Sequence, residues 1–479
     1  MKKLKFIDLF AGLGGFHLGL QRLGHKCVYA CEISPHLNEI YKKNFTTKYV
    51  DHNIKDADLK KIKKLKYDIL CAGFPCQPFS KAGPQSGFDH DVAGNMFFQI
   101  MRFVKAHSPK YLILENVPNL LTHAKGKTYL YMKKELEKNE YYVEEDMLSP
   151  IQFGIPQTRL RMYILAIKRK NKKDHPMIKW PIVKDNINEL RHPKTDLLKY
   201  FSKYFIKKPK RPRFLSEDKK KILRLWEDFL KRVPSGVSLV SPMWISEFGA
   251  TYPFENEAPR KIGYKKLQSY KGTFGATLKN KSKEKIFNDL LPPYATYSRS
   301  RNELKEESYE FPTWKKNFIK INREFYEDNK DWINPWLTKY KKSKILMLQE
   351  PTHRKFEWNC HGEKHTLDDK LISFRGSGIR VKRMNAAPTL IHASITQVPY
   401  IPKLKRYLSL EECLALQGLR EITNKINHNS WEKSYSAIGN AVNADVVEKI
   451  GETFLKKNIK EKNKFRLKPI QGNLEFLFK

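Results

Sequence analysis

Short apolar runs alternate with amphipathic stretches along the first 168 residues of the chain. Five runs have apolar centres typical of buried strands, namely KLKFIDLF, KCVYACE, KYDILCAG, KYLILEN and RMYILAI. Between them, four stretches have helical spacing with a polar face, namely GGFHLGLQRLG, SPHLNEIYKKN, NMFFQIMRFVKAH and GKTYLYMKKELEKNE. This alternation predicts an α/β domain with a mainly parallel sheet and helices on both faces. In such sheets, ligands bind at the carboxyl ends of the strands, where the strand order reverses.

The pattern changes after residue 170. Residues 171–383 are rich in Lys and aromatic residues and show little periodicity, which predicts a second, irregular domain rather than a disordered segment. Helical spacing returns in LSLEECLALQGL and AVNADVVEKIGETFLKK. We therefore expect a first domain over 1–170, an inserted domain over 171–383, a carboxy-terminal part over 384–455 that completes the first domain, and a basic tail over 456–479.

Charge favours a polyanionic partner. The chain has 91 Lys and Arg against 51 Asp and Glu, a formal net charge of +40, which indicates nucleic acid before a membrane surface. Alternatively, the protein is basic because its genome favours lysine codons, and it has no polyanionic partner. Six cysteines are too sparse for a disulfide framework, and CHGEKH at 360–365 lacks the paired spacing of a zinc site, so we expect no metal. No apolar run is long enough to cross a bilayer, and we expect a cytoplasmic, reduced protein.

One cysteine lies on a stiffened loop. In CAGFPCQPFS, residues 71–80, a buried strand leads to Cys76, and Pro75 and Pro78 prevent a helix from continuing through the segment. Such a position suits a nucleophile, with Pro75 and Gln77 as its neighbours. It also suits a small apolar filler, because free Cys is among the most buried residue types. The residues alone leave both readings open.

Other polar groups follow the predicted strands. FIDLFAGLGGF turns on Gly12, Gly14 and Gly15, whose backbone amides can approach a ligand closely. Glu32 ends the second strand, where a carboxylate either binds ribose hydroxyls or is simply solvated. Glu115 ends another apolar strand, and we expect it to have a perturbed pKa.

Two arginines precede the last strand of the first domain. In QFGIPQTRLRMYILA, Arg159 and Arg161 are two residues apart and can share one side of the chain. Guanidinium groups in that position suit phosphate or carbonyl oxygens. Alternatively, the two arginines are surface residues that only make the protein more soluble.

The order of these motifs carries more information than any one of them. DLFAGLGGF, Glu32, GFPCQPFS, ENV, QTRLR and SYSAIGNAV resemble, in sequence and in order, the motif series of the DNA (cytosine-5)-methyltransferases of bacterial restriction-modification systems. The resemblance covers residues 1–170 and 384–455, and residues 171–383 fall where that family has its target-recognition domain. It implies a Rossmann-like, S-adenosylmethionine-dependent methyltransferase domain with an inserted, irregular target-recognition domain.

The resemblance also implies catalytic roles. The Cys76 thiolate would add to carbon 6 of cytosine and so activate carbon 5, with Pro75 and Gln77 in its loop. Glu115 would hydrogen-bond ring N3, and Asn116 would brace the loop. Arg161 and Arg159 would hold the base and the nearby backbone. Because carbon 6 is unreachable in a stacked duplex, the base must be flipped out, and the loop from Gln77 to about Gly94 would close over it.

For the cofactor, S-adenosylmethionine, the resemblance assigns Phe10 to the adenine ring, Gly12 and Gly14 to the turn beside the methionine part, and Glu32 to the ribose. Asn440, in IGNAV, belongs to the returning carboxy-terminal motif. One position departs from the family. Where the family has an acid followed by Ile, this chain has Asn53 and Ile54, with Asp51 two residues away, so the residue that contacts the adenine stays open.

The implied partners are double-stranded DNA and a restriction endonuclease, with the chain acting as a monomer. Within the inserted domain, SFRGSGIRVKR at 373–383 is the strongest candidate for reading bases, through Arg375, Arg380 and Arg383. These arginines could instead hold phosphates, or the segment could be a hairpin leading back to the first domain. Three other functions stay open: an RNA-directed relative, a DNA-binding relic without activity, and a methylase fused to a nuclease that uses LDDK or NEL as its acidic element.

Overall fold

The computed structural model describes residues 2–75, 94–171, 174–183, 195–204, 209, 211–296, 310–348, 350–391, 398–426 and 430–456. The chain divides into two compact units. The first contains Met1–Pro209, Asn385–Ile395 and Leu410–Lys479, and the second contains Lys210–Met384 and Thr396–Ser409. The division falls after residue 209, whereas the sequence pattern changes at 171, and residues 396–409 belong to the second unit.

The first unit is built on a seven-stranded sheet in the order β3-β2-β1-β4-β5-β7-β6. Strands β1 to β5 are parallel, and β7 runs antiparallel to both of its neighbours. Chain order reverses between β1 and β4, so the carboxyl ends of these two strands flank the position where open α/β sheets bind ligands. The strands are β1 Lys5–Leu9, β2 Lys26–Cys31, β3 Val50–Asp51, β4 Ile69–Gly73, β5 Tyr111–Asn116, β6 Tyr141–Leu148 and β7 Arg161–Lys168.

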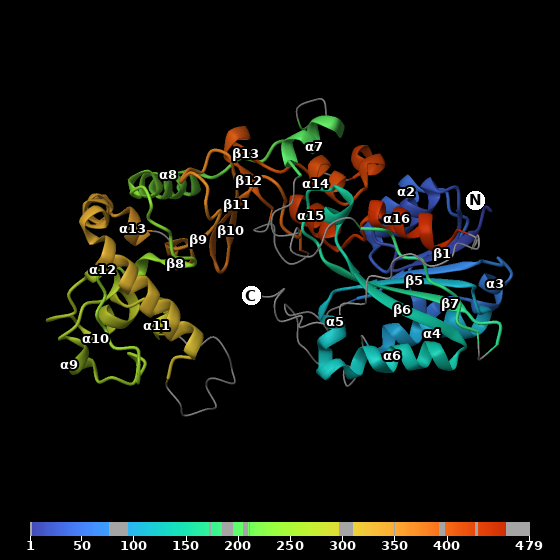
Figure 1. Ribbon diagram of the computed structural model, residues 1–479, viewed down its shortest axis with the longest axis horizontal. Coiled ribbons are helices and arrows are strands. Elements are labelled where there is room, and N and C mark those ends of the chain that lie inside the picture. Colours follow the sequence, from blue (N-terminus) through green and yellow to red (C-terminus); the bar gives the residue numbers. More distant parts are fainter. Residues whose placement is uncertain are drawn as a thin grey trace. The chain divides into compact units, whose positions relative to one another are not determined.

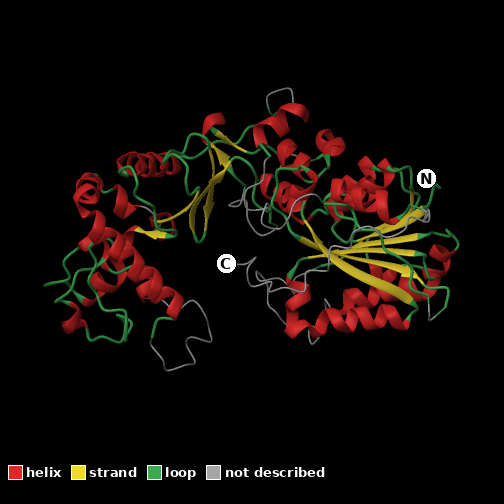
Figure 2. Ribbon diagram, in the orientation of Figure 1, coloured by secondary structure: helices red, strands yellow, loops and turns green. Residues whose placement is uncertain are grey.

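Helices cover both faces of this sheet (Figures 1 and 2), as the alternating pattern predicted. Figure 1 shows α2 (Pro35–Asn44) and α16 (Ala444–Phe454) on one side, and α4 (Gly94–His107) and α6 (Lys127–Lys138) on the other. Successive strand residues enter opposite cores, because side chains alternate across a strand. Ile69 and Cys71 pack with the α1 and α16 side, and Leu70 and Ala72 pack with the α4 and α6 side. The remaining helices here are α1 Gly15–Arg22, α3 Leu59–Lys63, α5 Asn119–Thr122 and α7 Leu197–Tyr204.

The carboxy-terminal part of the first unit contains α14 (Leu410–Leu416), α15 (Trp431–Asn440) and α16, and α16 packs against α1. Arg22, at the end of α1, forms salt bridges with this carboxy-terminal part. Its Nη1 lies 2.6 Å from Asp445 Oδ1, and its Nη2 lies 2.7 Å from Glu421 Oε2. Arg420 also pairs with Asp445, at 2.7 Å. The last part of the sequence therefore completes the domain that the first part begins.

The second unit is more regular than its sequence predicts. It contains a six-stranded sheet in the order β13-β12-β10-β11-β9-β8 and the 30-residue helix α12, Thr313–Lys342. Its strands are β8 Met243–Trp244, β9 Lys355–Asn359, β10 Lys370–Arg375, β11 Gly378–Arg383, β12 Tyr400–Ile401 and β13 Arg406–Tyr407. Its other helices are α8 Glu217–Arg232, α9 Tyr264–Leu267, α10 Lys283–Lys285, α11 Pro293–Thr296 and α13 Ile345–Leu348.

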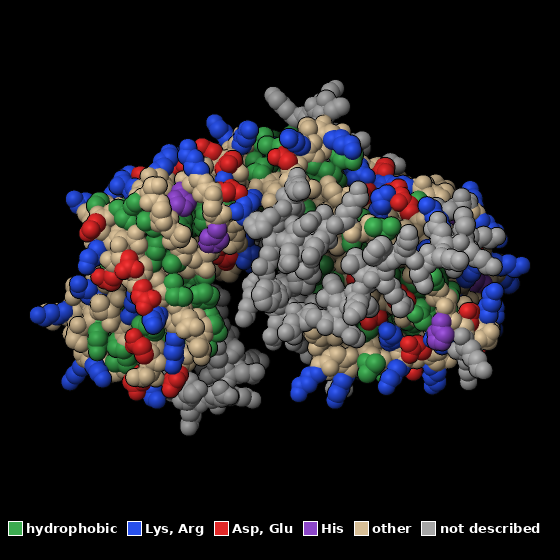
Figure 3. All heavy atoms as spheres, viewed as in Figure 1, with side chains coloured by type: hydrophobic (Ala, Val, Ile, Leu, Met, Phe, Trp, Pro, Cys, Tyr) green, Lys and Arg blue, Asp and Glu red, His purple; other side chains and the backbone are tan. Residues whose placement is uncertain are grey.

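Aromatic packing holds the second unit together, which explains its aromatic-rich sequence. Trp226 of α8 stacks on Phe356 of β9 with the ring centroids 4.3 Å apart, and Phe229 packs edge-on against Trp336 of α12. Lys and Arg side chains are spread over both units on the face shown in Figure 3, with Asp and Glu among them. In the part of the chain that the structure describes, no helix combines the length and apolarity needed to cross a membrane.

Candidate active site

A tight glycine turn follows β1. Phe10, Gly12 and Gly14 all have positive φ angles, of 58°, 54° and 79°. Such a value is rare for an aromatic residue, and residues held in sparsely populated conformations cluster at functional sites. A Cβ on Gly14 would lie 2.3 Å from the Phe45 ring, so only glycine fits there. The turn brings backbone N–H groups to the carboxyl edge of the sheet.

Glu32 closes this turn from the end of β2. Its Oε2 accepts a hydrogen bond from the Gly12 N–H at 2.8 Å, and its Oε1 accepts one from the Ser34 N–H at 2.8 Å. The side chain is buried, and burial raises the pKa of its carboxyl group above the ordinary value. Each carboxylate oxygen has a further lone pair, so Glu32 can also accept bonds from hydroxyl groups of a ligand. A buried acceptor beside a glycine turn fits a sugar-bearing cofactor.

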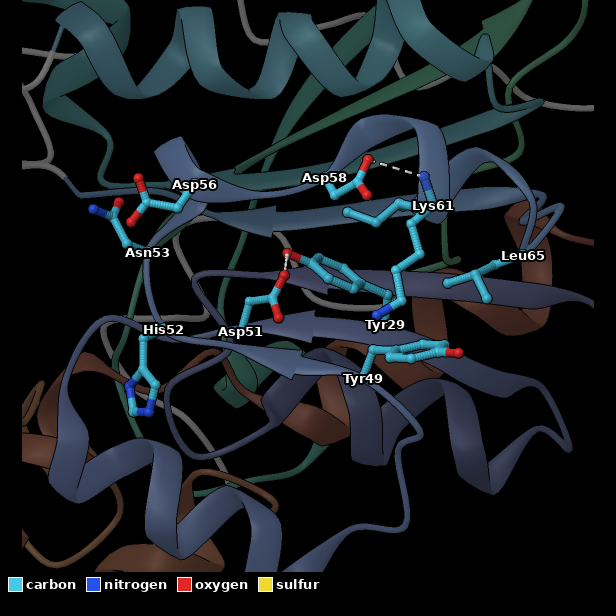
Figure 4. A pocket seen from close by; sticks show the side chains of 10 residues that line it. Tyr29, Tyr49, Asp51, His52, Asn53, Asp56, Asp58, Lys61 and Leu65 are labelled. Carbon is cyan, nitrogen blue, oxygen red and sulfur yellow. Dashed lines mark hydrogen bonds between the residues drawn. The ribbon is translucent and has the colours of Figure 1, made fainter.

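The two residues considered for the adenine contact occupy different surroundings. Asp51 and Asn53 both line a pocket of about 360 Å³ beside β2, β3 and α3. Figure 4 shows Asp51 directed toward Tyr29, whose hydroxyl donates to Asp51 Oδ2 at 2.9 Å, and Asn53 beside Asp56. The side-chain Oδ1 of Asn53 accepts the Lys55 N–H at 3.1 Å and caps a short 3₁₀ turn, Ile54–Asp56. Both side chains thus accept a hydrogen bond within the fold, and these contacts do not distinguish Asp51 from Asn53 as the residue toward the adenine.

The carboxy-terminal segment reaches this edge of the sheet. Asn440 is exposed at the end of α15, and the chain then passes beside the glycine turn. A Cβ on Gly15 would lie 2.1 Å from the carbonyl oxygen of Val442, and a Cβ on Gly73 would lie 2.9 Å from the Val442 side chain. The returning segment therefore contacts both the β1 turn and the end of β4.

Strand β4 ends next to the loop that contains Cys76. Cys71 and Phe74 are buried and Pro75 is exposed, whereas Cys76 and Gln77, and the loop from Gln77 to residue 93, lie outside the described residues. Asn116 Nδ2 donates to the Phe74 carbonyl at 3.3 Å, and its Oδ1 accepts the Val117 N–H at 2.8 Å. Asn116 thus holds the backbone two residues before Cys76.

Glu115 and Arg161 form a buried ion pair. Glu115 lies at the end of β5, in register with Gly73 of β4. Its Oε1 is 3.2 Å from Arg161 Nε, and the two side chains are 11% and 15% exposed. Burial raises the pKa of the Glu115 carboxyl group, and the charges of Arg161 and Arg159 act against that rise. A carboxyl group with a raised pKa can hold a proton for a ligand at this edge of the sheet.

Arg159 has different contacts. Its side chain is almost fully buried, and its two terminal nitrogens donate to the carbonyls of Leu390 and Ala441, each at 3.0 Å. Both carbonyls belong to the segments that return to the first unit late in the sequence. Arg159 therefore fastens those segments, and its charge also acts on Glu115 together with that of Arg161. Its contact with the base or the nearby backbone stays a prediction.

The three arginines that the sequence suggests for reading bases lie on a β-hairpin. Strands β10 and β11 pair antiparallel, with Arg375 opposite Gly378 and Ser373 opposite Arg380. Arg375 and Arg380 both pair with Glu357 of β9, and Arg383 pairs with Glu363 and with the His361 carbonyl. Sequence reasoning missed both glutamates, because nothing in the pattern around residues 357–363 indicates that this strand lies beside the hairpin. Among the described residues, no cluster of three or more His, Cys, Asp or Glu side chains could hold a metal ion.

Known proteins resemble this chain over most of its length. The family model for C-5 cytosine-specific DNA methylases matches residues 4–236 and 254–456. The Type II methyltransferase M.HhaI of Haemophilus parahaemolyticus is 42% identical over 165 residues, which cover 34% of this chain and 49% of that protein. M.AluI of Cellulosimicrobium cellulans is 28% identical over 501 residues, which cover 94% and 91%. The chain spans about half the length of relatives such as M.HhaI. For M.MspI of a Moraxella species, the matched residues cover 39% of that protein.

Solved structures add a weaker likeness. The Dnmt2 methyltransferase of S. pombe has a TM-score of 0.42 at 14% identity and covers 93% of this chain and 97% of its own. The Entamoeba histolytica methyltransferase EhMeth has a TM-score of 0.44 at 14% identity and covers 95% and 100%. The family match includes the β1 turn, the β4 and β5 ends, and the returning carboxy-terminal helices described above. By that match, the chain belongs to the family of C-5 cytosine-specific DNA methylases.

Proposed function

We propose that this protein transfers a methyl group to carbon 5 of a specific cytosine in double-stranded DNA. The observation that carries the proposal is the buried Glu115–Arg161 pair, at 3.2 Å, beside the strand that leads to Cys76. An acid and a cation at one edge of a sheet, with a cysteine three residues after β4 in the sequence, suit addition of a nucleophile to a pyrimidine ring. Membership of the family supports the same reaction.

The cofactor would lie at the carboxyl ends of β1 and β2. When bound there, S-adenosylmethionine supplies an electrophilic methyl group. The Gly12 and Gly14 turn would hold its methionine part, Glu32 its ribose hydroxyls, and Phe10 and Asn53 its adenine. The segment after Asn440 would close the pocket, since Val442 packs against Gly15. The buried Glu32 carboxylate, with lone pairs remaining, is the feature of this edge that best fits such a group.

The catalytic residues would act on a base rotated out of the duplex, because a stacked cytosine hides carbon 6. The Cys76 thiolate would add to carbon 6, which makes carbon 5 nucleophilic. Glu115 would hold a proton at ring N3 as charge develops there, and its raised pKa supports that role. Arg161 would orient Glu115 and contact the base, while Asn116 would position the loop through the Phe74 carbonyl. Once carbon 5 carries the methyl group, loss of its proton to water and elimination of the Cys76 thiolate from carbon 6 would restore the ring double bond and release the methylated base.

The physiological setting belongs to the same proposal. Type II methyltransferases are among the relatives, and we infer that the protein protects host DNA from a partner restriction endonuclease and acts as a monomer. The net charge of +40 supports a duplex DNA substrate. The second unit, inserted between family motifs, would read the target sequence.

A methyl-transfer assay tests the proposal. Purified protein is incubated with radiolabelled S-adenosylmethionine and with unmethylated plasmid DNA or a transfer-RNA pool, and bisulfite sequencing then locates the modified cytosines. We expect label in DNA only, at one cytosine within a short recurring sequence. Label in RNA alone would favour the RNA-directed relative. DNA binding without transfer would indicate a relic, and cleavage of the plasmid after magnesium is added would indicate a fused nuclease.

A further inference from the structure

The two faces of the β9–β10–β11 sheet differ in chemistry. One face is apolar and buried, and consists of Phe356, Trp358, Ile372, Phe374, Ile379 and Val381. The strand registers place Ser373, Arg375, Arg380, Lys382 and Glu357 together on the other face. Arg375 and Arg380 remain 22% and 34% exposed, so these two guanidinium groups are partly accessible to a partner. Ser373 and Leu371 on the same face are buried.

Glu357 is the acid that organises this face. It lies directly beside Arg380 in the parallel β9–β11 register, and its Oε2 accepts from Arg380 Nε. The same oxygen lies 3.5 Å from Arg375 Nη1, and its Oε1 accepts from the Ser377 hydroxyl, also at 3.5 Å. One carboxylate, itself 14% exposed, thus contacts both arginines and the turn of the hairpin.

Donors on this face outnumber acceptors. Each guanidinium has five N–H donors in a fixed plane, whereas Glu357 supplies two acceptor oxygens. The buried Nε of Arg375 has no hydrogen-bond partner among the residues that the structure describes. Burial and the nearby Arg380 lower the pKa of Arg375, and Glu357 opposes that effect. The face therefore fits a partner rich in acceptors that lie in one plane.

We propose that Glu357 is a specificity-determining residue, which fixes the guanidinium planes of Arg375 and Arg380 for the acceptor edge of guanine in the target sequence. Its negative charge has a second effect, because it reduces the attraction of both arginines to phosphates. The acceptor edge of guanine has only partial negative charges, so that repulsion is weaker for a base than for a phosphate. Glu357 thus raises selectivity at the expense of general DNA affinity. This inference rests on the proposed function, since it requires duplex DNA as the substrate.

The sign of the charge effect gives a sharp test. Glu357→Gln keeps the shape of the side chain and one acceptor but removes the charge. We expect binding to a random duplex to become about 2- to 5-fold tighter at low salt, because one repulsion is lost. We expect the ratio of cognate to random affinity to fall by a factor of about 5 to 100, the contribution of one bidentate arginine–guanine contact. The cognate duplex carries the sequence that bisulfite sequencing identifies, and the random duplex has equal length and composition.

Two further variants separate charge from geometry. Glu327→Gln removes the same charge from an exposed position on α12, and should leave the affinity ratio unchanged. Glu357→Asp keeps the charge but withdraws the carboxylate, and should lower the ratio without tightening random binding. If Glu357→Gln does not fold, the Glu357→Asp variant still tests the inference.

An unchanged ratio in both Glu357 variants, or an equal loss of cognate and random affinity, would overturn the inference. Methyl transfer to DNA by the wild type is measured in the same preparations. If the wild type transfers a methyl group and the affinity ratio is unchanged, only the inference about Glu357 fails. If the wild type transfers no methyl group to DNA, the proposed function itself fails.

Discussion

The carboxylate of Glu115 lies 3.2 Å from the guanidinium of Arg161, and both side chains are largely buried where β5 and β7 meet. Burial raises the pKa of the acid while the cation lowers it. The outcome is an acid whose protonation depends on its neighbours, at the edge of the sheet beside the loop that carries Cys76. The roles of Glu115 and Arg161 at this edge can each be measured.

Replacing Glu115 tests whether it acts on the base. Glu115→Gln should lower kcat by roughly two to four powers of ten, the usual weight of one acid–base group. Affinity for S-adenosylmethionine should change little, because the expected contacts of that cofactor lie at β1 and β2. Single-turnover methyl transfer and isothermal titration calorimetry measure the two quantities. Near-normal turnover would mean that Glu115 has only a structural role.

Replacing Arg161 tests the electrostatic coupling. If protonated Glu115 is the active form, the rate should fall as pH rises through its pKa, which burial places above the ordinary value. Arg161 lowers that pKa, so Arg161→Met should raise it and move the falling part of the kcat profile to higher pH. The position of that limb is the observable, since the rate itself will also fall when a base contact is lost. A limb that stays in place, or moves to lower pH, would contradict the coupling.

Covalent trapping tests the thiol. Cys76→Ser should abolish methyl transfer and leave DNA binding largely intact, because the hydroxyl is a far weaker nucleophile. A duplex with 5-fluorocytosine at the target should trap the wild type, since fluorine blocks the final elimination. Cys71 is the matched control: it is fully buried, and burial raises the pKa of its thiol well above the ordinary value. Mass spectrometry that maps the adduct to Cys71, or finds none, would refute the assignment.

The sequence predicted much of the catalytic domain and little of the inserted one. Compact apolar runs predicted β1, β2, β4, β5 and β7, because both faces of the sheet are buried, and helical spacing predicted the main helices. Strand β6, Tyr141–Leu148, was missed because Glu144, Glu145 and Asp146 interrupt its apolar pattern. Strand β3 has only two residues, too few to carry any pattern. Helix α12 was missed because Lys and aromatic residues surround its buried positions and Pro335 interrupts it.

Site residues divide in the same way. Glu115 and Asn116 could be placed at the carboxyl edge of the sheet because they end an apolar strand. Arg161 lies beside them because β7 runs antiparallel to β5 and begins at that edge. The contacts of Arg159 could not be predicted, since its acceptors lie 231 and 282 residues away along the chain. The pairing of Arg375 and Arg380 with Glu357 depends on the β9–β11 register, and sequence spacing gives no access to that register.

The close approach of Gly15 to Val442 predicts a steric effect. Gly15→Ala should lower the free energy of unfolding by about 1 to 3 kcal/mol, the usual cost of overpacking, because its Cβ would meet a backbone carbonyl rather than a flexible side chain. Affinity for S-adenosylmethionine should fall with it, since the displaced segment borders the β1 turn. Gly376→Ala is the control, as no atom lies within 4 Å of a Cβ built there. Urea denaturation and calorimetry provide the measurements, and equal stability of the two variants would exclude a tight contact.

Lys382 gives a prediction about pH and stability. Burial and the nearby Arg380 lower the pKa of its ammonium group from about 10.5 to about 8. Below pH 8 the folded protein must therefore keep a charge that the unfolded chain hydrates more easily. This costs up to about 3 kcal/mol, because each unit of pKa shift corresponds to about 1.4 kcal/mol. The cost disappears as pH rises through 8 toward 10.5, because the folded protein releases this proton before the unfolded chain does.

Lys382→Met should consequently raise the free energy of unfolding at pH 7, and the gain should shrink between pH 8 and pH 10. Lys364→Met, at an exposed position on the turn that precedes β10, should change stability by less than about 0.5 kcal/mol at any of these pH values. Urea denaturation of the wild type and both variants at pH 7, 8.5 and 10 measures the difference. A Lys382→Met variant that is less stable than the wild type at pH 7 would show that the ammonium group is stabilised by its surroundings. The polar face beside Glu357 would then hold less uncompensated positive charge than the arginine geometry indicates.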